Sequence, residues 1–229
     1  MILVYFSICT IILFCVTLGN KAVTTMSESQ EIDREYCIVI DPGHGGEDGG
    51  AVSCTGVPES SYNLEISLKL KDLLNLLGHQ TKLIRESDIS VYTKGETLSQ
   101  KKASDLKQRV RVLQDTENAI LLSIHQNHYP DSRYSGAQVF YAKTSGSEEL
   151  AKQMQSLFLL TVNKGSNRQA KMSSGIYLME HIQCPGVLIE CGFLSNVAEE
   201  AKLKDPEYQK KLCCVISSAT SQYLRTLDR

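Results

Sequence analysis

The sequence predicts a single α/β domain of three layers, with a mostly parallel sheet flanked by helices, behind an N-terminal hydrophobic segment. Short apolar runs alternate with longer amphipathic stretches over residues 37–229, which is the pattern of strands joined by crossover helices. The 229 residues contain neither an internal repeat nor a linker rich in proline or glycine. This argues against a string of several domains.

The N-terminal 26 residues differ in composition from the rest of the chain. The stretch from Ile2 to Leu18 carries no charge and is almost entirely apolar. Its length is the lower limit for a membrane span and exceeds a signal-peptide core of about 7–15 residues. We therefore expect a signal peptide or membrane anchor at residues 1–26 and a linker at 27–36, with a buried N-terminal helix of the fold as the alternative. An export signal or anchor would place the protein outside the cytoplasmic membrane.

Hydrophobic patterning predicts the elements of the domain in order. Leucines or valines spaced three or four residues apart indicate helices. Gly78 is a helix stop, Ser104 an N-cap, and Pro206 a first-turn residue. Residues 87–103 are polar and predict a loop. The predicted strands are Cys37–Ile40, Thr81–Arg85, Ala119–Ile124, Ala137–Tyr141 and Gly186–Ile189, and the predicted helices are 61–77, 104–116, 147–162 and 206–224.

Charge and cysteine content argue against several classes of function. The 24 basic and 26 acidic residues leave a net charge of −2, whereas nucleic-acid-binding proteins usually have a basic excess. None of the eight cysteines forms a C-x-x-C pair, which argues against a zinc knuckle. Cys37 and Cys191 fall in or beside apolar strand patterns, so we expect buried free thiols. Nothing supports a serine-hydrolase elbow, a P-loop or a dinucleotide-binding G-x-G-x-x-G.

Histidines and a carboxylate follow three of the predicted strands. His44 lies in DPGHGGEDGG after the first, His125 and His128 lie in HQNH after the third, and Glu190 follows the last. Sites in open α/β sheets form beyond the carboxyl ends of the strands, so these side chains should converge. His44 and His125 supply two ligands for a catalytic zinc, which needs three. The third must be a nearby acid or another histidine. Glu59 is well placed if the glycine-rich loop folds back.

These motifs, in this order, resemble the zinc-dependent N-acetylmuramoyl-L-alanine amidases of the amidase-3 type over roughly residues 38–223. IDPGHGGEDGGA and SIHQNH resemble the two zinc motifs of that family, ESSYNLEI its E-x-x-x-N-L segment, and VLIECGFLSN its signature with the catalytic glutamate. LIRESD and LKQR resemble two further motifs. The resemblance implies one Zn²⁺ per chain, held by His44, Glu59 and His125, with Glu190 as the catalytic residue of a domain at 37–229.

The resemblance also implies a reaction, the hydrolysis of the amide between N-acetylmuramic acid and L-alanine in peptidoglycan. Arg168 lies in NRQAK, which resembles a family stretch beside the site. Arg168, Asn127 and His128 are therefore candidates for substrate contacts; surface charge is the alternative for Arg168 and an exposed loop position for His128. Asp41 and Asn127 are candidates to orient the histidine ligands.

Within the family the chain most resembles the compact amidases of endospore formers that act on spore cortex. Those enzymes prepare muramic-δ-lactam formation by a separate deacetylase. The hydrophobic N-terminus, the NRQAK…IYLM stretch and an end soon after Tyr223 carry this likeness. It implies a location at the outer face of the cytoplasmic membrane, in the cell wall, or between the forespore and mother-cell membranes. A membrane or lipoprotein activator is a candidate partner, and no nucleic acid is expected. A zinc peptidase acting within the stem peptide and a partner-dependent wall-binding protein are the alternatives.

Overall fold

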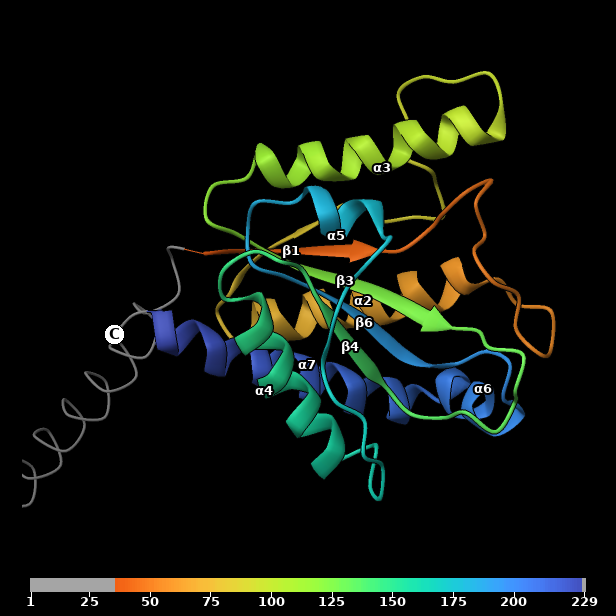
Figure 1. Ribbon diagram of the computed structural model, residues 1–229, viewed down its shortest axis with the longest axis vertical. Coiled ribbons are helices and arrows are strands. Elements are labelled where there is room, and N and C mark those ends of the chain that lie inside the picture. The colour runs from red at the N-terminus through yellow and green to blue at the C-terminus, as the bar shows by residue number, and fades with distance from the viewer. Residues whose placement is uncertain (1–35, 228–229) are drawn as a thin grey trace, which may run out of the picture. The chain divides into compact units, whose positions relative to one another are not determined.

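The computed structural model describes residues 36–227, which belong to one compact α/β unit (Figure 1). The signal peptide or anchor predicted at residues 1–26 lies outside the described residues, as does the linker predicted at 27–36 apart from its last residue. Within 36–227, no helix combines the length and apolar character that a membrane crossing requires.

A six-stranded sheet forms the middle layer, in the order β2-β1-β3-β6-β4-β5. Strands β2, β1, β3 and β6 are parallel to one another, whereas β4 is antiparallel to β6 and parallel to β5. The prediction of a mostly parallel sheet is confirmed. The strands are β1 (Cys37–Pro42), β2 (Gln80–Leu83), β3 (Ala119–Asn127), β4 (Gln138–Tyr141), β5 (Lys171–Met172) and β6 (Gly186–Phe193).

Helices cover both faces of the sheet and complete the three layers (Figure 1). On β1, the side chains of Ile38 and Ile40 pack in the core formed with α2, α4 and α7, while Cys37 and Val39 pack with α3 and α5. Burial of both faces explains why the strands read as continuous apolar runs. The helices are α2 (Glu59–Leu76), α3 (Leu98–Gln114), α4 (Ser147–Leu160), α5 (Tyr177–His181), α6 (Val197–Lys204) and α7 (Pro206–Leu227).

Helix α3 begins earlier than the sequence analysis predicts. Its N-cap is Thr97, whose side chain accepts the backbone N–H of Gln100, while the Gln100 side chain accepts the N–H of Thr97. This is a capping box. The prediction of a loop over 87–103 is therefore wrong for its last six residues. Ser104 is not an N-cap but a buried residue inside the helix.

Strands β1, β3 and β6 extend beyond their predicted ends, and the last two extensions place functional residues. Strand β3 continues to Asn127 and β6 to Phe193, so His125 and Glu190 lie inside paired strands, directly opposite each other. The sequence pattern does not reveal β5, because its two residues are exposed and form no apolar run. It does not reveal α5 or α6, because helices of five and eight residues have too few positions to show a helical period. The six described cysteines are free, and Cys37 and Cys191 are buried, as predicted.

Candidate metal centre

His44 lies in the glycine-rich loop that follows β1. Its backbone φ is +60°, a left-handed conformation that residues with side chains adopt infrequently. A Cβ on Gly43 would lie 2.3 Å from the ring of His125, and a Cβ on Gly50 would lie 2.7 Å from both His44 and Glu59. Glycine at these two positions therefore lets the loop fold back against the other functional side chains. The rings of His44 and His125 meet edge to face, with their centroids 5.1 Å apart.

Glu59 is the first residue of α2, and its carboxylate is fixed by several hydrogen bonds. Oε2 accepts the backbone N–H of Ala51 at 3.1 Å. Oε1 accepts the backbone N–H of Gln126 and the side-chain amide of Asn63, each at 3.1 Å. The backbone N–H of Glu59 in turn donates to the carbonyl of Ala51 at 2.8 Å. The loop after β1 thus folds back on the start of α2, the condition under which Glu59 can join the two histidines.

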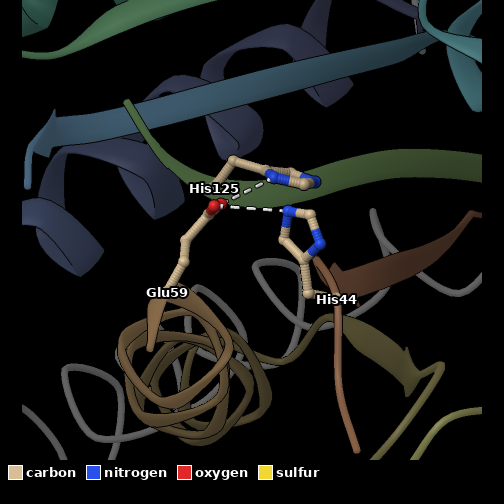
Figure 2. Close-up of side chains that lie close together, drawn as sticks. All are labelled: His44, Glu59 and His125. Atoms are coloured by element: carbon tan, nitrogen blue, oxygen red, sulfur yellow. Dashed lines mark hydrogen bonds and ion pairs between the residues drawn. The ribbon is translucent and has the colours of Figure 1, made fainter. Parts of the chain in front are cut away.

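The side chains of His44, Glu59 and His125 converge on one point, as Figure 2 shows. Glu59 Oε1 lies 2.9 Å from His125 Nδ1, and Glu59 Oε2 lies 3.3 Å from His44 Nε2. One ligand atom from each residue lies within 4.8 Å of the others, so the cluster could hold a metal ion. Two imidazoles and a carboxylate suit zinc and leave a fourth coordination position for water or substrate. The residues present therefore fit the ion that the resemblance implies.

The pKa values reflect how strongly the cluster favours positive charge beside Glu59. Burial raises the pKa of Glu59, but hydrogen bonds from His125 and His44 outweigh it and hold that pKa well below its usual range. Burial lowers the pKa of His44, but its hydrogen bonds with Asp48 and Glu59 outweigh this and raise it to about 9. The carboxylates thus stabilise a cationic group at the place where the ligand atoms converge.

Glu190 lies next to the cluster, on the strand beside His125. Its Cα is paired with that of His125 in the β3–β6 ladder, so the two side chains project from the same face of the sheet. Its Oε2 is buried and has no hydrogen-bond partner within residues 36–227. Burial raises the pKa of Glu190 to about 7, and Glu59 adds to the effect. Buried carboxylates of this kind are typical of catalytic acids and bases.

The three predicted substrate contacts are not members of this cluster. Arg168 donates to the side chain of Gln138 at 2.9 Å, and its guanidinium lies over the ring of Phe193, 5.0 Å from the centroid. Asn127 ends β3, and His128 is exposed just beyond it. In the part of the chain that the structure describes, none of these side chains hydrogen-bonds to a member of the cluster.

Neither of the two candidates taken from the sequence hydrogen-bonds to His44 within residues 36–227. The carboxylate of Asp41 is bound by Arg109 and by the hydroxyl of Ser123 instead of by an imidazole. Asp48 Oδ2 lies 3.0 Å from His44 Nδ1. Asp48 stands four positions after His44 in the same loop, and this short spacing of an acid to a histidine is the signal that could have revealed it.

The fold and this cluster define an α/β protein with a His–Glu–His cluster that could hold a metal ion at the carboxyl edge of its parallel strands. Comparison with known families agrees with that class. The family described as N-acetylmuramoyl-L-alanine amidase matches residues 38–221. The chain belongs to this family and is an enzyme of its class.

Individual relatives are similar to this chain in sequence and in fold. The germination-specific N-acetylmuramoyl-L-alanine amidase of Bacillus subtilis is 39% identical over 81% of this chain and 78% of its own. LytC of the same species is 30% identical over 82% of this chain, but the match spans 35% of LytC. The CwlD amidase of Clostridioides difficile, solved in complex with the GerS lipoprotein, superposes with a TM-score of 0.80 and 38% identity, covering 83% of this chain and 99% of that one.

Proposed function

We propose that this amidase uses one Zn²⁺ ion, held by His44, Glu59 and His125, with Glu190 as its catalytic base. The observation that carries the proposal is the convergence of the three ligand atoms within 4.8 Å, beside a buried oxygen of Glu190 that has no hydrogen-bond partner within residues 36–227. Such an arrangement supplies three protein ligands and an independent proton acceptor, the two parts that hydrolysis by a metal site requires.

The zinc ion and Glu190 would contribute different parts of the chemistry. Zinc held by these three residues would lower the pKa of a water molecule to about 7 and would draw electron density from a carbonyl group. Glu190 accepts the proton that the attacking water loses as its oxygen bonds to the lactyl carbonyl carbon. The same carboxyl group then delivers this proton to the nitrogen of L-alanine as the C–N bond breaks. The products are a lactyl carboxylic acid, which releases its proton to solvent at neutral pH, and the free α-amine of L-alanine, and the Glu190 carboxylate is regenerated.

We further propose that the substrate is spore-cortex peptidoglycan and that the reaction precedes muramic-δ-lactam formation by a separate deacetylase. The similarity to the germination-specific amidase of Bacillus subtilis over most of both chains supports this choice. Purified cortex and vegetative peptidoglycan, digested with the enzyme and resolved by mass spectrometry, test it. We expect intact stem peptides with free N-terminal L-alanine, released faster from cortex. Cleavage inside the stem would indicate a peptidase, and equal rates on the two walls would refute the cortex preference.

A lipoprotein activator and an extracytoplasmic location complete the proposal. The CwlD amidase, which shares this fold, was solved in complex with the GerS lipoprotein. Residues 1–26 would export or anchor the enzyme, and 27–36 would link that segment to the catalytic domain at 37–229. Cell fractionation during sporulation, with protease treatment of intact cells, tests the location. Pull-down with a lipoprotein of the same kind, followed by an activity assay of the complex, tests the partner.

A further inference from the structure

The loop that carries His44 is backed by one face of α3. Lys102, Asp105 and Arg109 are spaced three and four residues apart, so their side chains share a face of the helix. Arg109 Nη2 donates to the carbonyl oxygen of His44 at 2.7 Å, and Arg109 Nε donates to Asp105 at 2.6 Å. Arg109 is 2% exposed. This buried contact fixes the backbone of His44 but leaves the orientation of its ring to another group.

That group is Asp48. Its Oδ2 lies 3.0 Å from Nδ1 of His44, on the side of the ring away from Glu59, which faces Nε2 at 3.3 Å. The backbone of Asp48 is held by two reciprocal hydrogen bonds with Gly45, of 2.8 and 3.2 Å. Lys102 Nζ lies 3.1 Å from the same Oδ2. The imidazole is therefore held between two carboxylates, one on each ring nitrogen.

We propose that Asp48 is a positioning residue of the metal centre. It accepts the Nδ1–H of His44, so that this imidazole presents an unprotonated Nε2 toward Glu59 and the ion. The inference rests on the proposed zinc site and adds to it a residue outside the ligand set. A carboxylate on the far nitrogen of a ligating histidine fixes its tautomer and raises the basicity of the ligating nitrogen, and its loss typically costs 10–100-fold in metal affinity.

The geometry also explains why the loop needs this particular acid. His44 has a positive φ, so its ring leaves the backbone in a direction that the strand before it does not determine. Glu47, the neighbouring acid in the loop, pairs instead with Lys101 at 2.8 Å and has no contact with the histidine among the described residues. Of these two adjacent carboxylates, one faces the metal ligand and the other faces α3. The chain therefore offers its own matched control.

The test compares Asp48→Asn with Glu47→Gln in the full-length chain. Zinc affinity is measured by chelator competition without substrate, and melting temperature is measured with and without zinc. Asp48→Asn should bind zinc roughly 10–100-fold more weakly, with a smaller zinc-induced rise in melting temperature. Glu47→Gln should stay within about twofold of wild type, as for a surface substitution.

The outcomes separate this inference from the proposed function. An Asp48→Asn chain that binds zinc as wild type does would overturn the role of Asp48 and leave the zinc site standing. A metal-free Asp48→Asn chain that melts well below wild type while its zinc affinity is unchanged would show that Asp48 stabilises the loop and does not act on the ligand, which also overturns it. A wild-type chain that binds no zinc would refute the metal centre itself.

Discussion

Replacing Glu190 with glutamine separates proton transfer from metal binding. The substitution keeps the size of the side chain and removes its ability to accept a proton. Because Oε2 has no hydrogen-bond partner within residues 36–227, the change removes no hydrogen bond at this atom. Because the His44–Glu59–His125 cluster does not include Glu190, it also leaves the proposed ligands in place. The fold and the zinc content should therefore survive.

The expected loss lies in the chemical step. Removing a general base typically lowers the rate about 10²–10⁴-fold, which corresponds to roughly 3–5 kcal/mol in the activation barrier. The free energy of unfolding should change by no more than about 1 kcal/mol, or about 2–4 °C in melting temperature for a domain of this size. The assay is the release of free N-terminal L-alanine from peptidoglycan, with zinc measured by mass spectrometry on the same preparation.

Glu65→Gln on α2 is the matched control for this experiment. Glu65 pairs with Lys69 on the exposed side of that helix, and an exposed pair of this kind contributes little to stability. Its activity, zinc content and melting temperature should all equal those of wild type. A Glu190→Gln chain that loses zinc would make Glu190 a ligand. One that retains near-normal turnover would refute its role as the base and direct attention to another proton acceptor, such as His128.

Three further predictions address the metal, the N-terminus and acid stability. His125→Ala leaves two protein ligands. Zinc affinity should therefore fall by much more than the roughly 10–100-fold that is typical of substitutions outside the ligand set. Unchanged zinc content would contradict the assignment of His125 as a ligand. A chain starting at Ser27 should be soluble and active, and aggregation of that chain beside an active full-length protein would place the removed residues in the core. Burial raises the pKa of Glu200, but hydrogen bonds with Thr55 and other groups outweigh this effect and lower the pKa from 4.5 to about 2. The stabilisation that this carboxylate contributes is therefore fully present above pH 4.5 and is lost as the pH falls toward 2. Glu200→Gln should make the melting temperature fall less steeply over that pH range. An unaltered dependence of melting temperature on pH would refute the linkage.

The central strands and two of the cluster residues could be predicted from the sequence because buried strands have a recognisable apolar pattern. The central strands are buried on both faces, so they read as apolar runs, and His44 and His125 stand where those runs end. The third member, Glu59, could be placed only conditionally. Its carboxylate joins the cluster because Gly43 and Gly50 leave room for the loop to return, and a return of this kind depends on three-dimensional contacts that a linear pattern does not contain.

Other features depend on contacts between residues far apart in the chain. The antiparallel direction of β4 cannot be read from its four residues, since apolar runs look alike in either direction. Arg109 reaches the carbonyl of His44 across 65 positions. The early start of α3, in contrast, was readable, because Thr97 and Gln100 form a capping box within one turn. The contact of Asp48 with His44 depends on both sequence and conformation. The two residues are near in sequence, but their side chains meet where His44 has a positive φ.

The three cluster residues come from different layers of the fold, and this affects how a metal would bind. His44 is held through the face of α3, Glu59 begins α2 on the opposite side of the sheet, and His125 belongs to the central strand β3. An ion bound by all three would link both helical layers to the sheet. The cluster does not depend on that link to form, because Glu59 already contacts both rings and is held by backbone groups of Ala51 and Gln126. The site is therefore preorganised, so the cost of ordering the ligands is met during folding, and metal exchange should proceed without unfolding of the domain.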